Sequence, residues 1–201
     1  MQLIEIIRNR RSIRKYTNQR IEKEKLDMIL EAGLYAPNPG GRQDAKIILL
    51  DDPETIEKIG VVNANCENRG RGGVSKEQPS IMDDLSIKSG FYGCQALAII
   101  CIQRSKKDQV NQIGGAFACA QNMTLEAYDL GIGSCIVGRA EATFLQEGMS
   151  PYLERWGLDE EYMPIVFVCL GYVNGSYLAT KPRKEGRSIF ISDKEQEGHD
   201  R

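Results

Sequence analysis

Histidine is almost absent from the 201-residue chain, and this scarcity removes several kinds of chemistry. The only histidine, His199, lies in a polar segment close to the C-terminus. A Ser-His-Asp or Cys-His relay, or a zinc site with imidazole ligands, would depend on that one side chain. The six cysteines form no C-x-x-C pair, so a thiolate zinc or iron–sulfur site lacks its usual local spacing. We therefore expect no metal site and interpret most cysteines as reduced core residues.

The chain also lacks a large excess of either charge sign, and it lacks long apolar runs. The 26 lysines and arginines stand against 28 acidic residues, so no general field draws the protein onto nucleic acid or an anionic membrane. Aromatic residues make up 7% of the chain and do not interleave with its cations as base-stacking platforms would. No apolar run approaches the roughly 18 residues of a membrane helix, and Glu5 interrupts the first short apolar stretch, unlike a secretory signal. These absences predict a cytoplasmic protein with no nucleic-acid and no membrane partner.

The hydrophobic pattern predicts strands separated by helices, which indicates one layered domain that combines a sheet with helices. Strands are expected at 47–50, 97–102, 132–137 and 165–170, the first two of them buried on both faces. Helices are expected near 3–7, 22–36, 53–60, 108–130 and 141–155. The predicted domain covers 1–183, with a polar excursion or lid at 63–89 and a polar tail at 184–201.

A dense group of cations lies near the N-terminus. Five of them fall within eight residues, with a serine hydroxyl in their midst: Arg8, Arg10, Arg11, Ser12, Arg14 and Lys15. Guanidinium groups offer planar forks that match phosphate oxygens. The alternative is a solvated basic turn, which spacing alone favours. A second cation pair, Lys181 and Arg183, follows the last strand, and it supports a phosphate site only if it meets the first group in space.

Three glycines, at 131, 133 and 138, surround a short apolar stretch and let backbone amides approach a flat ligand. The segment is not a Walker A loop, because Arg139 stands where that loop requires lysine. It also departs from the dinucleotide fingerprint, because Ile136 occupies the position of the third glycine.

Taken together, these segments resemble the nitroreductase family of flavin mononucleotide (FMN) enzymes over residues 3–183. Residues 10–16 (RRSIRKY) are similar to the family's R-x-S-x-R-x-[FY] phosphate motif, and residues 36–43 (APNPGGRQ) to its A-P-S-x-x-N-x-Q loop. The most specific match is QNMTLEA at 121–127 followed by LGIGSC at 130–135. In the loop, Asn38 replaces the usual serine and Gly41 stands where asparagine is common.

The resemblance implies an α+β domain, with a mixed sheet packed between helices, that forms an intertwined homodimer holding FMN in two interface pockets. It implies that Arg10, Arg11, Ser12 and Arg14 bind the phosphate and ribityl groups, and that Lys181 and Arg183 close on the phosphate. The backbone of Ile136, Val137 and Gly138 would face the isoalloxazine, with an amide near Gly138 at N5. Pro37, Asn38 and Pro39 would arrive from the partner subunit, in the same loop as Gln43.

By the same resemblance, hydride moves from NADH or NADPH to flavin N5 and then to an electron-poor acceptor, such as a nitroaromatic or a quinone, in ping-pong order. The flavin carries the chemistry, so no side chain is assigned as catalytic acid or base. Two alternatives stay open: a flavoenzyme of the same fold with other chemistry, such as dehalogenation or flavin destruction, and a flavin-binding sensor or carrier without turnover.

Overall fold

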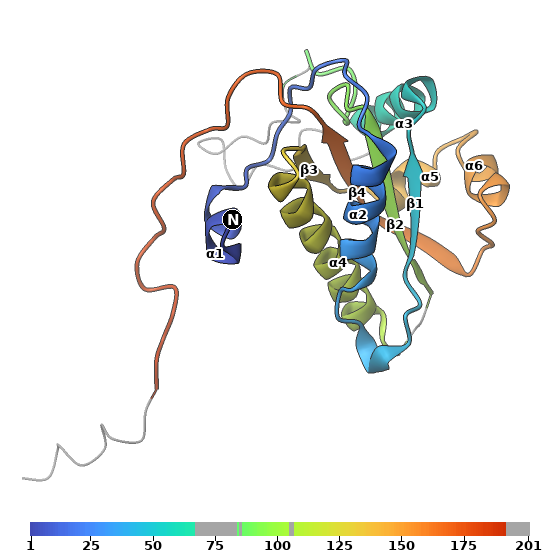
Figure 1. The fold of residues 1–201 in the computed structure, drawn as a ribbon. Coiled ribbons are helices and arrows are strands. Elements are labelled where there is room, and N and C mark those ends of the chain that lie inside the picture. Colours follow the sequence, from blue (N-terminus) through green and yellow to red (C-terminus); the bar gives the residue numbers. More distant parts are fainter. Residues whose placement is uncertain (67–83, 85, 105–106, 192–201) are drawn as a thin grey trace, which may run out of the picture.

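The computed structural model describes residues 1–66, 84, 86–104 and 107–191. A four-stranded sheet is packed between helices (Figure 1), so the predicted α+β class is confirmed. The helical elements are α1 (Leu3–Asn9), α2 (Lys23–Leu34), the 3-10 turn η1 (Pro39–Gly41), α3 (Pro53–Asn65), α4 (Gln109–Asp129), α5 (Ala140–Phe144) and α6 (Ser150–Arg155). The strands are β1 (Lys46–Leu50), β2 (Ala96–Gln103), β3 (Gly133–Val137) and β4 (Tyr162–Gly171).

The sheet has the order β1-β2-β4-β3, and neighbouring strands pair antiparallel. In the described part of the chain, the parallel pairing expected of a mixed sheet is limited to an isolated bridge between Ser12 and Ser134. β2 and β4 are central and buried on both faces. β1 is an edge strand and only half-buried, so the expected burial of 47–50 on both faces is wrong. An apolar run cannot distinguish a central strand from an edge that another surface covers.

Each face of the sheet carries its own core. Because side chains alternate along a strand, β2 directs Ala98 and Ile100 to the face covered by α2 and α4, and Leu97 and Ile99 to the face covered by α3 and α5. α2 and α4 lie close together at Gly33, where an added Cβ would be 2.8 Å from Met123 Cγ. The long helix predicted at 108–130 is confirmed as α4.

Two predicted helices have different bounds. The helix expected at 141–155 is broken into α5 and α6, because Gly148 has a left-handed φ of 78° and Pro151 lies in the first turn of the next helix. α3 begins as predicted, with the Asp52 carboxylate accepting from two backbone amides, but it continues to Asn65. Residues 63–65 are therefore helical rather than part of an excursion. Most of 63–89 lies outside the described residues, and its role as a lid stays a prediction.

The two ends of the described chain leave apolar side chains exposed. In α1, only Ile6 of the predicted apolar face is buried, while Leu3 and Ile7 are exposed. The chain after β4 forms no helix or strand over its described residues, and it runs away from the body of the molecule past α1 (Figure 1). Ile189, Phe190 and Ile191 are 85–90% exposed on this segment.

Candidate functional site

The segment 10–16 lies beside β3. Ile13 N–H donates to Ser134 O at 2.8 Å, and the Ser12–Ser134 bridge forms at the same place. Gly133 permits this approach, because a Cβ there would lie 2.8 Å from Val173 and 3.1 Å from Ile13. The glycine-rich stretch and the cation cluster, separated by more than a hundred residues, therefore meet.

Tyr16 anchors the far end of this segment. Its ring is buried against Gly171, where an added Cβ would lie 2.7 Å from the ring. Its hydroxyl donates to Ile13 O at 2.7 Å. Burial raises the pKa of Tyr16 well above its usual value, so the phenol stays neutral. Tyr16 thus fixes the backbone from which the cations project.

A cleft of about 520 Å³ opens beside this segment. Its lining comes from three parts of the chain: Ser12, Ile13, Arg14 and Lys15; Ile87 and Tyr92; and Val173, Asn174, Gly175, Ser176 and Leu178. The Arg14 guanidinium lies 5.8 Å from the centre of the Tyr92 ring. Tyr92 has a left-handed φ of 58°, which is rare for a residue with a large side chain and is typical of functional sites. The sequence alone assigned no role to Tyr92, although glycines lie close to it at 90 and 93.

Several buried donors of the arginine cluster (Arg10, Arg11 and Arg14) and of the adjoining strand β3 have no protein acceptor. Among the described residues, Arg10 Nε, Arg14 Nε and Ser134 Oγ are buried without a hydrogen-bond partner. Burial lowers the pKa of Arg10, with a smaller contribution from neighbouring Arg11, but arginine stays charged at neutral pH. Buried polar groups are normally satisfied, so these atoms indicate a ligand that supplies acceptor oxygens.

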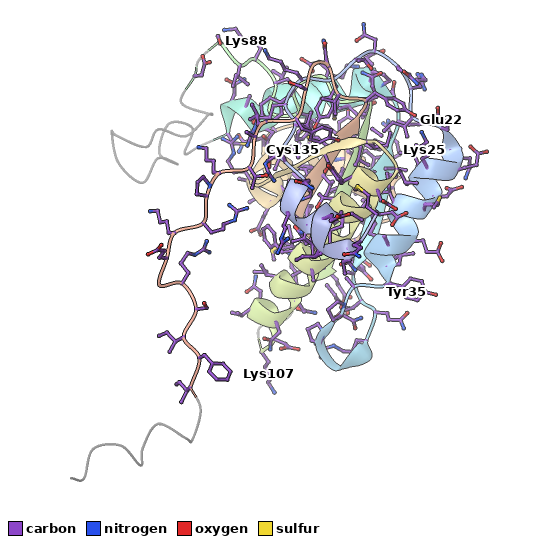
Figure 2. The ribbon with its side chains drawn as sticks, turned by 60° about the vertical axis from the view of Figure 1, so that its left-hand side comes forward. Glu22, Lys25, Tyr35, Lys88, Lys107 and Cys135 are labelled. Carbon is purple, nitrogen blue, oxygen red and sulfur yellow. The ribbon has the colours of Figure 1, made fainter. Side chains whose placement is uncertain are left out.

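Cys135, labelled in Figure 2, is buried on β3 and interacts with Arg10, Ser12 and Arg14. Burial raises the pKa of its thiol, while the charges of Arg14 and Arg10 and a hydrogen bond with Ser12 act in the opposite direction. The net rise keeps the thiol neutral, so Cys135 packs as a small apolar residue and not as a nucleophile.

Arg11 joins the segment after α1 to the segment after β4 by hydrogen bonds. Its Nη1 donates to Arg8 O at 2.8 Å and to Arg10 O at 2.5 Å, and its Nη2 donates to Thr180 Oγ1. Thr180 Oγ1 in turn donates to Arg8 O at 3.3 Å. The segment after β4 therefore reaches the first cation group, although its next cations, Lys181 and Arg183, have exposed side chains. Thr180 was not predicted, because a threonine beside a charged pair carries no distinctive signal.

The end of β3 is open to a ligand at Gly138. Val137 is buried and Ile136 half-buried, whereas Gly138 is exposed. A Cβ added at Gly138 would meet nothing within 4 Å. The backbone here is thus accessible from outside the chain.

The loop with Pro37, Asn38, Pro39 and Gln43 lies elsewhere. It follows α2 at the lower end of the molecule in Figure 1, whereas the segment 10–16 passes β3 near the upper end. The loop lines a separate cavity of about 150 Å³. Within it, Gln43 N–H donates to Asn38 Oδ1 at 2.9 Å. Within one chain, the structure does not bring this loop to the arginine cluster.

Among the described residues, metal-binding groups and membrane-spanning helices are both absent. No group of three or more His, Cys, Asp or Glu residues in that part of the chain could hold a metal ion. No helix found there is long and apolar enough to cross a membrane.

In this α+β domain, the segment beside edge strand β3 carries two arginine Nε donors, of Arg10 and Arg14, that have no protein acceptor, and such a site is suited to bind a phosphorylated small molecule. The sequence model of the nitroreductase family matches residues 7–172, and the chain belongs to this family. An FMN reductase (NADPH) of Bacillus subtilis is 29% identical over 190 residues, which cover 93% of this chain and 72% of that protein.

Solved structures share the fold. A nitroreductase with bound FMN from Bacteroides fragilis superposes with a TM-score of 0.79 at 23% identity, covering 96% of this chain and all of the other. A nitroreductase with bound FMN from Desulfitobacterium hafniense gives the same TM-score at 20% identity, covering 96% of this chain and 99% of the other. These likenesses confirm the nitroreductase fold.

Proposed function

We propose that this protein is an FMN-dependent oxidoreductase that takes a hydride from NADH or NADPH and passes it to an electron-poor acceptor such as a nitroaromatic or a quinone. Family membership supports the reaction class, and the B. subtilis relative is named an FMN reductase that uses NADPH. The observation that carries the proposal is the set of buried donors without acceptors at Arg10, Arg14 and Ser134.

The residues present fit FMN. Its phosphate supplies the acceptor oxygens that Arg10 Nε and Arg14 Nε lack within the protein. Arg11 contributes mainly by its hydrogen bond to Thr180. Because Lys181 and Arg183 follow Thr180 in the chain, this bond brings them toward the same phosphate. Ser12, on the wall of the cleft, is assigned to the ribityl chain. The accessible backbone of Gly138, with Ile136 and Val137, is assigned to the isoalloxazine, and an amide near Gly138 would hydrogen-bond N5.

When bound, FMN supplies the capacity to accept a hydride and to release it to a second substrate. The protein binds the phosphate and orients the ring system against the end of β3. In this proposal no side chain transfers a proton. The free, buried state of all six cysteines is consistent with a reducing compartment and supports a cytoplasmic location.

We further propose an intertwined homodimer. The loop at 37–43 lies apart from the arginine cluster of its own chain, so a contact of Pro37, Asn38, Pro39 and Gln43 with the cofactor would come from a partner subunit. The exposed apolar side chains of α1 and of the segment after β4 support this assembly, because a second chain would cover them.

The function is tested by purifying the protein and recording its visible spectrum, then adding NADH or NADPH without oxygen. We expect a yellow protein that is bleached by one or both nucleotides. Arg10→Ala and Arg183→Ala should each weaken FMN binding by about tenfold or more, because each removes a charge-assisted contact.

The control is Arg20→Ala, since Arg20 is exposed and donates only to Asp51 O in the described structure. It should retain FMN fully. Full retention of FMN in both Arg10→Ala and Arg183→Ala would contradict the phosphate clamp. A wild-type protein that neither contains nor takes up FMN would overturn the proposed function itself.

A further inference from the structure

The backbone that leaves β3 turns through a left-handed corner. Arg139 follows Gly138 with φ 64° and ψ 26° and forms the N-cap of α5. L-residues with a long side chain rarely adopt this conformation, and it persists only where the surrounding structure holds it. This corner, formed by Gly138 and Arg139, includes the backbone assigned to flavin N5.

Asn63 of α3 holds this corner from the interior. Its side chain is fully buried, and its Nδ2 donates to Gly138 O at 3.1 Å and to Thr143 Oγ1 at 3.0 Å. Its Oδ1 accepts from Arg139 Nη2 at 3.3 Å. One amide side chain therefore contacts both residues of the corner and the helix that follows it.

Thr143 completes the network. It is fully buried on α5, and its hydroxyl donates to Arg139 O at 2.7 Å while its backbone N–H donates to the same oxygen at 2.9 Å. The carbonyls of Gly138 and Arg139 are thus both fixed by buried donors. A network of buried, satisfied hydrogen bonds makes one backbone conformation dominant.

The turn that begins at Gly90 leaves space for the Asn63 side chain. A Cβ added at Gly90 would lie 2.1 Å from Asn63 Oδ1, and Gly90 N–H donates to Gly60 O of α3 at 2.8 Å. The turn therefore packs directly on α3 at this level. Its glycine leaves the space that the amide occupies.

We propose that Asn63 is a positioning residue for the redox reaction: through Gly138 and Arg139 it fixes the end of β3 against the isoalloxazine. This inference rests on the proposed function. Asn63 is buried beneath Gly138 and acts through that backbone, and Thr143 is its partner in the same role.

The test uses the FMN-loaded protein with Asn63→Asp and Thr143→Val. Asn63→Asp keeps the shape of the side chain but removes the two N–H donors, and Thr143→Val removes the hydroxyl. For both we expect a shift in the midpoint potential and visible absorption bands of the bound flavin. We also expect about a tenfold lower rate of flavin reduction by NAD(P)H, because misplaced reacting groups react slowly. FMN affinity should change little, since the arginine cluster is untouched.

Asn122→Asp is the matched control. Asn122 lies on α4, on the opposite face of the sheet, and its Nδ2 also donates to a backbone carbonyl, Ala32 O, at 3.1 Å. The same chemical change there should leave the flavin spectrum and potential at wild-type values. If Asn63→Asp acted only by lowering stability, Asn122→Asp would be expected to change the flavin spectrum and potential as well.

A rescue variant tests the corner itself. Glycine adopts the left-handed conformation without support, so Arg139→Gly added to Asn63→Asp should restore most of the potential and rate. Failure of this rescue would overturn the proposal, because Asn63 would then act through something other than the corner. If Asn63→Asp does not fold, the same rescue is tested by adding Arg139→Gly to Thr143→Val.

If the wild type binds FMN and both primary variants keep its spectrum, potential and reduction rate, the positioning role is refuted while the proposed function stands. If the wild type does not bind FMN, the proposed function fails and the positioning role fails with it.

Discussion

Arg10 and Arg11 are neighbours in the chain, but their guanidinium groups meet different surroundings. Arg11 donates to two backbone carbonyls and to Thr180, so its hydrogen bonds hold the protein together. Arg10 Nε is buried without a protein acceptor. We therefore expect loss of Arg10 to affect mainly cofactor binding, and loss of Arg11 to affect the attachment of the segment after β4 as well.

Tyr16 provides a prediction about stability and pH. Tyr16→Phe removes the hydrogen bond to Ile13 O and leaves a buried acceptor unpaired, which should cost about 1–2 kcal/mol of unfolding free energy at pH 7. Urea denaturation measures this loss.

The same variant tests the raised pKa of Tyr16. The unfolded phenol ionises near pH 10, whereas the folded one ionises at a clearly higher pH. Between these two values the unfolded state loses a proton that the folded state keeps, so this contribution to stability is present below pH 10 and falls above it. The difference between wild type and Tyr16→Phe should therefore shrink above pH 10. A constant difference would show that the folded hydroxyl is not protected from ionisation.

At the scale of elements, the packing of α2 on α4 depends on Gly33. A Cβ there would lie 2.8 Å from Met123 Cγ, 3.0 Å from Ile47 Cδ1 and 3.1 Å from Cys119 Sγ. Gly33→Ala should therefore force the helices apart and lower the unfolding free energy by about 1–3 kcal/mol.

Gly114→Ala is the control, because it makes the same change within α4 where a Cβ meets nothing within 4 Å. It should stabilise the protein by about 0.5–1 kcal/mol, since alanine restricts the unfolded chain. Thermal or urea unfolding of both variants checks the pair, and equal effects would contradict the close approach at Gly33.

The elements were predicted best where one face had a strong period or a clear cap. The apolar stripe of α4, the apolar run of β2 and the start of α3 at Pro53 are local signals, and all three were confirmed. The break between α5 and α6 was missed because the amphipathic pattern continues across Gly148. The burial of β1 was wrong because edge position is a property of the sheet and not of the strand's own residues.

At the scale of the whole molecule, the exposed apolar segment at the C-terminal end points to the assembly. Phe190→Glu should shift the proposed dimer toward monomer, because a carboxylate would replace an apolar side chain at a buried contact. Light scattering coupled to gel filtration measures the mass. FMN occupancy should fall in parallel if the loop at 37–43 reaches the partner's cofactor.

Ser188→Glu serves as the control, since it adds the same charge on the same segment without removing an apolar group. It should leave the mass unchanged. A wild-type mass equal to that of Phe190→Glu would contradict the role of Phe190 in assembly.

The sequence by itself determined the alternation of helices and strands, the scarcity of histidine and the presence of two cation groups, because these depend on local composition and period. Tertiary structure decided which of these groups meet. Ile13 lies against Ser134 only because Gly133 leaves room, and Thr180 reaches Arg11 only because β4 directs the chain back to the N-terminus.

The proposed role of Asn63 could also be found only from the fold. The sequence shows a polar residue near the end of a helix, and nothing in it indicates that the Asn63 amide binds the backbone of Gly138, 75 residues further along the chain. Contacts between distant segments depend on how the elements pack, and no local pattern encodes that packing.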